Sequence, residues 1–372
     1  MIQPELRVKK ERNLGVDLLR CVAMWMIACL HILNRGGVIT GSTAQSYNWL
    51  LPLNVLVACG VNLYALISGY VTVMGRFHPA RVAELWLQVL CSNLVIAVFG
   101  EIMQPHIMDE FWIRCLFPLT QKCFWYFTAY VGVYAFSPLI NRGLRQLNPR
   151  QCRAVLWTML LLFSAGTFFG YLRQGDPWGI GTGYTVLWLL VLYVIGACIR
   201  LSDFGKNTAW WKLLLLAALL LAVAALLRSV IGTGKDVSLF QKNLRGQLLY
   251  YVSPTAAGIS VCLLILFSRI RVKGAAVKPV RFFAPLTFGI YIIHVHHVNW
   301  VWLEKTYRPL GKLAPPLAVL AVLGAGLGLF LACSVLEWGR SLLFRRLRVR
   351  QGLDALESRF LGWLQQGPND TP

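Results

Sequence analysis

Three ionisable residues stand inside the first long apolar run of the chain: Asp17, Arg20 and His31. Charged and titratable groups are costly in hydrocarbon, so each is a candidate functional residue. Ten residues separate Arg20 from His31. At about 100° per residue this spacing projects both side chains from one helix face, about 16 Å apart along the axis. The pattern fits a guanidinium and an imidazole at the two ends of a polar pathway.

Two structural interpretations compete with this one. Asp17 lies one turn before Arg20, so the two charges are placed to form an ion pair that only lowers the cost of burial. For a histidine taken alone, a neutral His31 that is merely hydrogen-bonded inside a helical bundle is the favoured interpretation. The shared face of Arg20 and His31 favours a functional interpretation.

A second histidine, His294, stands in a later apolar run that begins near residue 282. It lies about 18 Å along that helix, at a depth similar to His31, so we expect the two imidazoles to approach each other. His296 and His297 follow nearer the boundary of the run, where histidines are cheap to keep. We expect no metal site.

Smaller signals accompany these residues. Ser68 and Gly69 supply small and polar groups that permit close packing or line a cavity, and close packing is the expected role of Gly69. Trp125 and Tyr126 open another apolar run, where an aromatic belt is expected at a membrane interface. Cys115 and Cys123 share a predicted external loop, and whether they pair is left open by the sequence.

The elements that must position these residues are membrane helices. Apolar residues make up 57% of the 372 positions and charged residues 14%, a balance typical of a bilayer protein. A helix crosses the hydrocarbon with about 20 residues. Ten such windows fall near 15–33, 50–74, 82–103, 124–140, 155–171, 183–201, 209–230, 248–269, 282–301 and 314–341. We therefore predict an all-α polytopic membrane bundle of about ten transmembrane helices.

Basic residues set the predicted orientation. Counted from a cytoplasmic start, 24 Lys and Arg fall inside, 11 outside and Arg20 within the first helix, which follows the positive-inside rule. We predict a cytoplasmic segment at 1–14, a membrane domain at 15–342 and a cytoplasmic tail at 343–372, with both termini in the cytoplasm. The tail is polar and its last residues are expected to be disordered.

The formal charge of +21 is spread between the helices and forms no single patch. This distribution argues against nucleic acid as a partner and favours contact with anionic membrane lipid. A basic cytoplasmic face also attracts a phosphorylated cosubstrate such as a nucleotide or coenzyme A. No motif reports an oligomeric state.

Several of these segments together resemble acyltransferase family 3, a family of bacterial integral-membrane acyltransferases. The specific part is Asp17-Leu-Leu-Arg20 followed by ten residues and His31. The similarity extends over most of the chain through Ile67-Ser68-Gly69-Tyr70, Trp125-Tyr126-Phe127 with Ser137-Pro138, and Phe288-Gly-Ile-Tyr291-Ile-Ile-His294. Some relatives carry a fused hydrolase-like domain, and we expect this protein to be of the type without one.

The resemblance implies an acyl-CoA-dependent O-acyltransferase of the bacterial inner membrane. Such an enzyme moves acetyl, or another short acyl group, from cytoplasmic acyl-CoA to a hydroxyl of a cell-envelope sugar or glycolipid. His31 would act as the general base or be acylated, and Arg20, Arg76 and Arg81 would hold coenzyme A. Many members have two arginines three residues apart, whereas Arg76 and Arg81 are five apart with Pro79 between them.

The remaining residues are expected to line the site without an assigned role: Asp17, Ser68, Trp125, Tyr126, Tyr291 and His294. A transporter of a small polar solute or amino acid is the alternative function, because a polar stripe through a bundle also builds a solute or proton path. A purely structural scaffold gives no reason for the shared face of Arg20 and His31.

Overall fold

The structure is a computed structural model, and it describes residues 12–172, 175–231 and 238–365. All regular elements in these residues are helical. The long helices are α1 (Leu14–Asn34), α3 (Ala44–Thr72), α4 (Pro79–Met103), α6 (Trp125–Leu144), α9 (Val186–Ser202), α10 (Trp210–Val230), α12 (Pro254–Ser268), α16 (Pro315–Arg346) and α17 (Val349–Gln365). The predicted all-α class is confirmed.

Shorter helices complete or connect the long ones. A π-helical segment, η1 (Leu160–Ala165), joins α7 (Pro149–Met159) to α8 (Gly166–Leu172) in one run. A second run consists of η2 (Gly274–Ala276), α13 (Val277–Phe283), η3 (Ala284–Leu286) and α14 (Thr287–Val295). The connecting helices are α2 (Val38–Gly41), α5 (Trp112–Leu116), α11 (Leu239–Gln247), α15 (His297–Leu303) and η4 (Arg308–Lys312).

Seven helical runs of the described chain are long and apolar enough to cross a membrane, and α9 and α12 are shorter apolar helices. Every one of the ten predicted windows contains a helix. The chain is therefore a polytopic helical membrane protein, while the count of ten and the cytoplasmic placement of both termini stay predictions. The outward surface agrees with a bilayer, because α10 exposes apolar side chains such as Leu215, Leu219 and Leu226.

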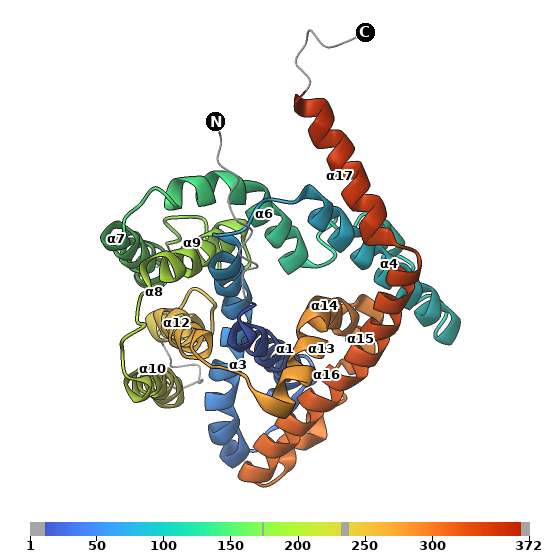
Figure 1. Cartoon of the computed structure of the whole chain (residues 1–372). Coiled ribbons are helices and arrows are strands. Elements are labelled where there is room, and N and C mark those ends of the chain that lie inside the picture. Colours follow the sequence, from blue (N-terminus) through green and yellow to red (C-terminus); the bar gives the residue numbers. More distant parts are fainter. Residues whose placement is uncertain (1–11, 173–174, 232–237, 366–372) are drawn as a thin grey trace, which may run out of the picture.

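Helix α1 lies near the centre of the bundle, with α9, α10 and α12 to one side and α13, α14 and α16 to the other (Figure 1). It packs against α3, α12, α14 and α16. Helix α3 also packs closely on α9, where a Cβ on Gly69 would overlap the Tyr193 carbonyl and one on Gly196 would overlap the Leu66 carbonyl. The packing role predicted for Gly69 is confirmed.

The tail beyond α16 is more ordered than its polar composition indicates. Helix α17 extends from the end of α16 alongside α4 (Figure 1). Arg350 of α17 donates to Glu84 of α4 at 2.7 Å, and Glu357 lies 3.4 Å from the His78 ring. These ion pairs fasten α17 across the start of α4. The predicted disorder at the end of the tail, 366–372, lies outside the described residues.

Candidate functional site

Helix α1 begins with a cap and an ion pair that fix the position of Arg20. The Asn13 side chain accepts hydrogen bonds from the Gly15 and Val16 amides. Asp17, 2% exposed, accepts from Arg20 Nη1 at 3.0 Å and also pairs with Arg12. The predicted Asp17–Arg20 pair is therefore formed, and it holds the guanidinium in one orientation.

A cavity of about 870 Å³, here called the basic cavity, opens at the end of the bundle where α1 and α4 begin and where α3 and α16 end. Its described lining contains eight arginines: Arg12, Arg20, Arg81, Arg281, Arg340, Arg345, Arg348 and Arg350. Glu84 and Glu337 are the carboxylates in that lining. This excess of guanidinium groups makes the cavity suited to a ligand with several negative charges.

Both carboxylates of the basic cavity orient an arginine. Glu337, 1% exposed, accepts from Arg340 Nε at 2.9 Å and from Arg340 Nη2 at 2.6 Å. Gln88 of α4 donates to the same carboxylate at 3.0 Å. Gly289 of α14 makes room for this group, because a Cβ there would overlap the Glu337 carboxylate. Asp17 holds Arg12 and Arg20 in the same way. Of the eight arginines, Arg81, Arg281, Arg345 and Arg348 make no ion pair within the described residues, and a ligand could bind them.

A second cavity of about 40 Å³, here called the histidine cavity, lies deeper in the bundle. Its lining is aromatic and apolar apart from His31: Met24, Ile27, Val61, Tyr64, Trp125, Tyr126, Tyr251, Phe288 and Tyr291. Three of these side chains, Tyr64, Tyr126 and Phe288, also line the basic cavity. The two cavities are therefore neighbours that share an aromatic wall, and Arg20 and His31 lie on opposite sides of it.

His31 is held by the second predicted histidine. His31 Nδ1 lies 2.9 Å from His294 Nε2, and His294 Nδ1 lies 2.6 Å from the Ile290 carbonyl oxygen. A carbonyl oxygen only accepts, so Nδ1 of a neutral His294 carries the proton and its Nε2 accepts from His31 Nδ1. This pattern assigns the free lone pair of His31 to Nε2. The predicted approach of the two histidines is confirmed.

The other side of His31 is covered by aromatic and charged groups. The Trp300 ring stands edge-on to the His31 ring, with centroids 4.8 Å apart. The Arg35 guanidinium lies over the Trp300 ring at 5.6 Å and pairs with Glu304 at 3.0 Å. Trp300 belongs to α15, while Arg35 and Glu304 lie in the connections beside it. These groups stand on the side of His31 away from the basic cavity.

The predicted site residues divide between these features. Arg20, Ser68, Arg81 and Tyr126 line the basic cavity, while His31, Trp125, Tyr126 and Tyr291 line the histidine cavity. Asp17 and His294 act through hydrogen bonds to Arg20 and His31. Arg76 is exposed on the connection between α3 and α4 and is not part of the lining of either cavity.

Several residues of the site are not singled out by the sequence alone. An acidic residue inside an apolar run is a direct signal, and this signal was present for Glu337. Tyr64 and Tyr251 carried no signal, because aromatic residues are ordinary in membrane helices. The arginines at the end of α16 fit membrane orientation and attraction of a phosphorylated cosubstrate equally well, because charge alone does not separate the two roles.

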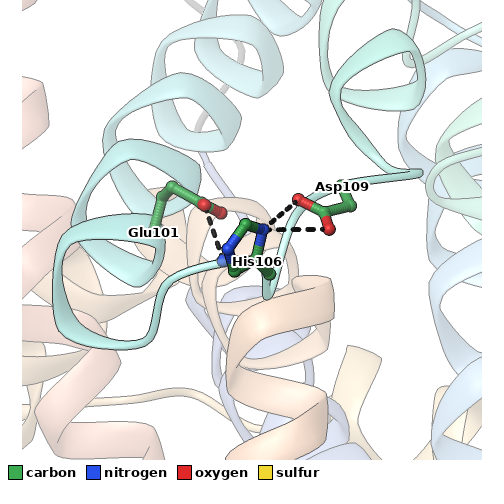
Figure 2. Close-up of side chains that lie close together, drawn as sticks. All are labelled: Glu101, His106 and Asp109. Carbon is green, nitrogen blue, oxygen red and sulfur yellow. Dashed lines mark hydrogen bonds and ion pairs between the residues drawn. The ribbon is translucent and has the colours of Figure 1, made fainter.

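One group in the described chain has the spacing of a metal site: Glu101, His106 and Asp109, which meet just after the end of α4 (Figure 2). The Glu101 carboxylate accepts from the His106 and Met108 amides at 2.7 and 3.1 Å. The group therefore closes a surface turn.

The cysteines of the described chain form no disulfide. All ten are free thiols, so Cys115 and Cys123 are not paired.

These features define a helical membrane protein with a basic cavity and a half-buried, oriented histidine on either side of an aromatic wall. The model of acyltransferase family 3, described as an acyltransferase domain, matches residues 13–335. The match covers most of the 372 residues, and the chain belongs to this family of membrane acyltransferases. Neither the curated proteins nor the solved structures contain a match.

Proposed function

We propose that the protein transfers acetyl, or another short acyl group, from acyl-CoA to a hydroxyl of a cell-envelope sugar or glycolipid. One observation carries the proposal: a cavity rich in arginine and the cavity of a half-buried, oriented histidine share a wall made of three aromatic side chains. A thioester donor needs an anchor for its charged part and a base near its reactive end. Both requirements have candidates within one bundle.

The basic cavity supplies the proposed anchor for coenzyme A. Its volume of about 870 Å³ lies in the range of small-molecule sites, about 300–1,000 Å³. Guanidinium groups bind phosphate through paired, charge-assisted hydrogen bonds. Arg20 and Arg81 line the cavity, and Arg340 in the same lining is oriented by Glu337. The acyl-pantetheine arm would then extend past Tyr64, Tyr126 and Phe288 toward His31.

His31 is the proposed general base. The acceptor hydroxyl gives its proton to His31 Nε2 while its oxygen attacks the thioester carbonyl carbon. The carbon–sulfur bond then breaks, and the proton returns from His31 to the departing thiolate. His294 accepts from His31 Nδ1, so it holds the imidazole in the required tautomer and stabilises its charged form. An acyl-histidine would need the same free nitrogen.

The proposed orientation places the basic cavity toward the cytoplasm of a bacterial inner membrane. Arg12 at the start of α1 and Arg345 at the end of α16 line the same cavity, so both ends of the membrane domain lie on one side of the bundle. Cytoplasmic acyl-CoA would enter there, and the envelope acceptor would approach the covered side of His31. The acceptor is named only by its hydroxyl chemistry.

The test uses the purified protein in proteoliposomes, with acetyl-CoA, a bacterial envelope glycan extract and measurement of released coenzyme A thiol. His31→Asn removes the base and is expected to lower kcat by about 10²–10⁴-fold. His106→Asn is the matched control, since His106 is exposed on a surface turn and asparagine tolerates its left-handed backbone.

The two competing functions give different results in this system. A His31→Asn protein that still binds coenzyme A but turns over within twofold of wild type contradicts the proposal. Wild-type vesicles that move a solute without consuming acetyl-CoA would support the transporter instead.

A further inference from the structure

Two buried hydroxyl groups in the histidine cavity have no protein partner. Tyr126 Oη and Tyr291 Oη are buried without a hydrogen bond in the described residues, and both side chains line the cavity together with His31. Buried polar groups in native proteins are nearly always paired, so each exception calls for a physical explanation. A ligand that places an acceptor atom in this cavity would supply one.

The other tyrosines of the same cavity provide an internal comparison. Tyr64 donates to the Arg20 carbonyl at 2.9 Å, and Tyr251 accepts from the Tyr184 hydroxyl at 3.2 Å. Among the four tyrosines of the lining, the unpartnered pair is thus Tyr126 and Tyr291. They come from different helices, α6 and α14, and their ring centroids are 6.1 Å apart. The Tyr291 hydroxyl lies beside the Tyr126 main chain, outside hydrogen-bond geometry.

The size of the cavity limits what enters it. A water-sized group needs about 10–15 Å³ of such space, so about 40 Å³ holds about three non-hydrogen atoms. An acetyl group has a methyl carbon, a carbonyl carbon and an oxygen. Its oxygen would accept the hydrogen bonds that the Tyr126 and Tyr291 hydroxyls do not make within the described residues. The apolar wall formed by Met24, Ile27 and Val61 suits the methyl group.

We propose that Tyr126 and Tyr291 are the oxyanion donors of the acyl transfer. This inference rests on the proposed function. When the acceptor oxygen attacks the thioester carbon, the carbonyl π electrons move onto its oxygen and the acceptor proton passes to His31 Nε2. The two hydroxyls donate hydrogen bonds to this oxygen and keep their protons. When the carbonyl re-forms, the carbon–sulfur bond breaks and His31 returns the proton to sulfur.

The geometry gives this role a physical advantage. Both donors stand in a site lined by apolar and aromatic groups, where a hydrogen bond to developing charge is stronger than in water. Packing fixes their rings before the reaction: Tyr291 stands edge-on to Phe124 at 6.0 Å, and Tyr126 stands edge-on to Tyr64 at 6.4 Å. Donors that are already in place cost no reorganisation during the chemical step.

The experiment compares Tyr126→Phe, Tyr291→Phe and the double variant in the same proteoliposome assay with acetyl-CoA and envelope glycan extract. Each single change keeps the ring and removes one donor, so kcat is expected to fall about 10²-fold while KM for acetyl-CoA changes less than threefold. Tyr134→Phe is the matched control on α6, because its hydroxyl bonds the His78 main chain outside both cavities.

Failure of this inference is distinguishable from failure of the proposed function. If wild type turns over acetyl-CoA and His31→Asn does not, while both Tyr→Phe variants keep kcat within twofold, the oxyanion role is overturned and the acyltransferase stands. A stable acetyl adduct on either tyrosine in intact-mass analysis also overturns it, since that result makes the residue a nucleophile. If the wild-type protein consumes no acetyl-CoA, that result contradicts both the proposed function and the oxyanion role.

Discussion

The basic cavity and the histidine cavity differ in almost every physical respect. The first measures about 870 Å³ and is lined by eight arginines at one end of the bundle, whereas the second measures about 40 Å³ and is lined by aromatic and apolar side chains around His31. Charge in the first is balanced by a few carboxylates that each hold an arginine. Polarity in the second is limited to an oriented imidazole and phenolic hydroxyls.

This contrast indicates a division of labour within one fold. Binding a highly charged donor requires many cations that remain partly solvated, because isolated charges are too costly to bury. Proton transfer and oxyanion stabilisation require the opposite: few polar groups, fixed in a site that excludes water. The aromatic wall of Tyr64, Tyr126 and Phe288 lets both environments exist within a short distance.

The contrast between the two cavities predicts its largest effect for donor binding in the basic cavity. Arg81→Gln is expected to raise KM for acetyl-CoA by about tenfold to a hundredfold, the range of one hydrogen bond to a charged group, with little change in kcat. Arg346→Gln is the matched control, because Arg346 is exposed beside the cavity and outside its lining. Steady-state kinetics at fixed salt measure both values. Equal KM values for Arg81→Gln and wild type would break the assignment of this cavity to the donor.

A smaller effect is expected in the wall of the histidine cavity. Met24→Ala enlarges the space beside His31, so the ratio of kcat/KM for butyryl-CoA to that for acetyl-CoA should rise about tenfold, as expected when a pocket gains room for added methylenes. Met26→Ala removes the same atoms from α1 outside both cavities and should leave the ratio unchanged. A ratio that is equal in the two variants would show that the histidine cavity does not select the length of the acyl chain.

The sequence predicted the helices and the central stripe well, because both follow from periodicity and burial. A 3.6-residue repeat places Arg20 and His31 on one face, and helix depth brings His294 to His31. The Asp17–Arg20 pair follows from local spacing in the same way. The stripe and the ion pair lie within α1 and need no knowledge of how distant helices pack. For His294 the sequence gives only its depth, and the packing of α14 against α1 completes the contact.

Features that depend on packing between helices were not predictable in the same way. The difference between Arg81, which lines the basic cavity, and Arg76, which does not, depends on the path of the connection between α3 and α4. Tyr126 and Tyr291 have no hydrogen-bond partner among the described residues, because the neighbouring helices place no suitable polar group beside their hydroxyls. Helix α17 is held by tertiary ion pairs such as Arg350–Glu84, which its polar composition does not reveal.

The most direct test of the central claim is a cryo-electron microscopy structure of the protein with a non-hydrolysable acetyl-CoA analogue. The account predicts phosphate density beside Arg20 and Arg81 in the basic cavity. It also predicts the acyl carbonyl in the histidine cavity, with its oxygen within hydrogen-bond distance of Tyr126 or Tyr291 and its carbon facing His31. An analogue bound with its phosphates elsewhere, or with its acyl group stopped on the basic side of Tyr64, Tyr126 and Phe288, would contradict it.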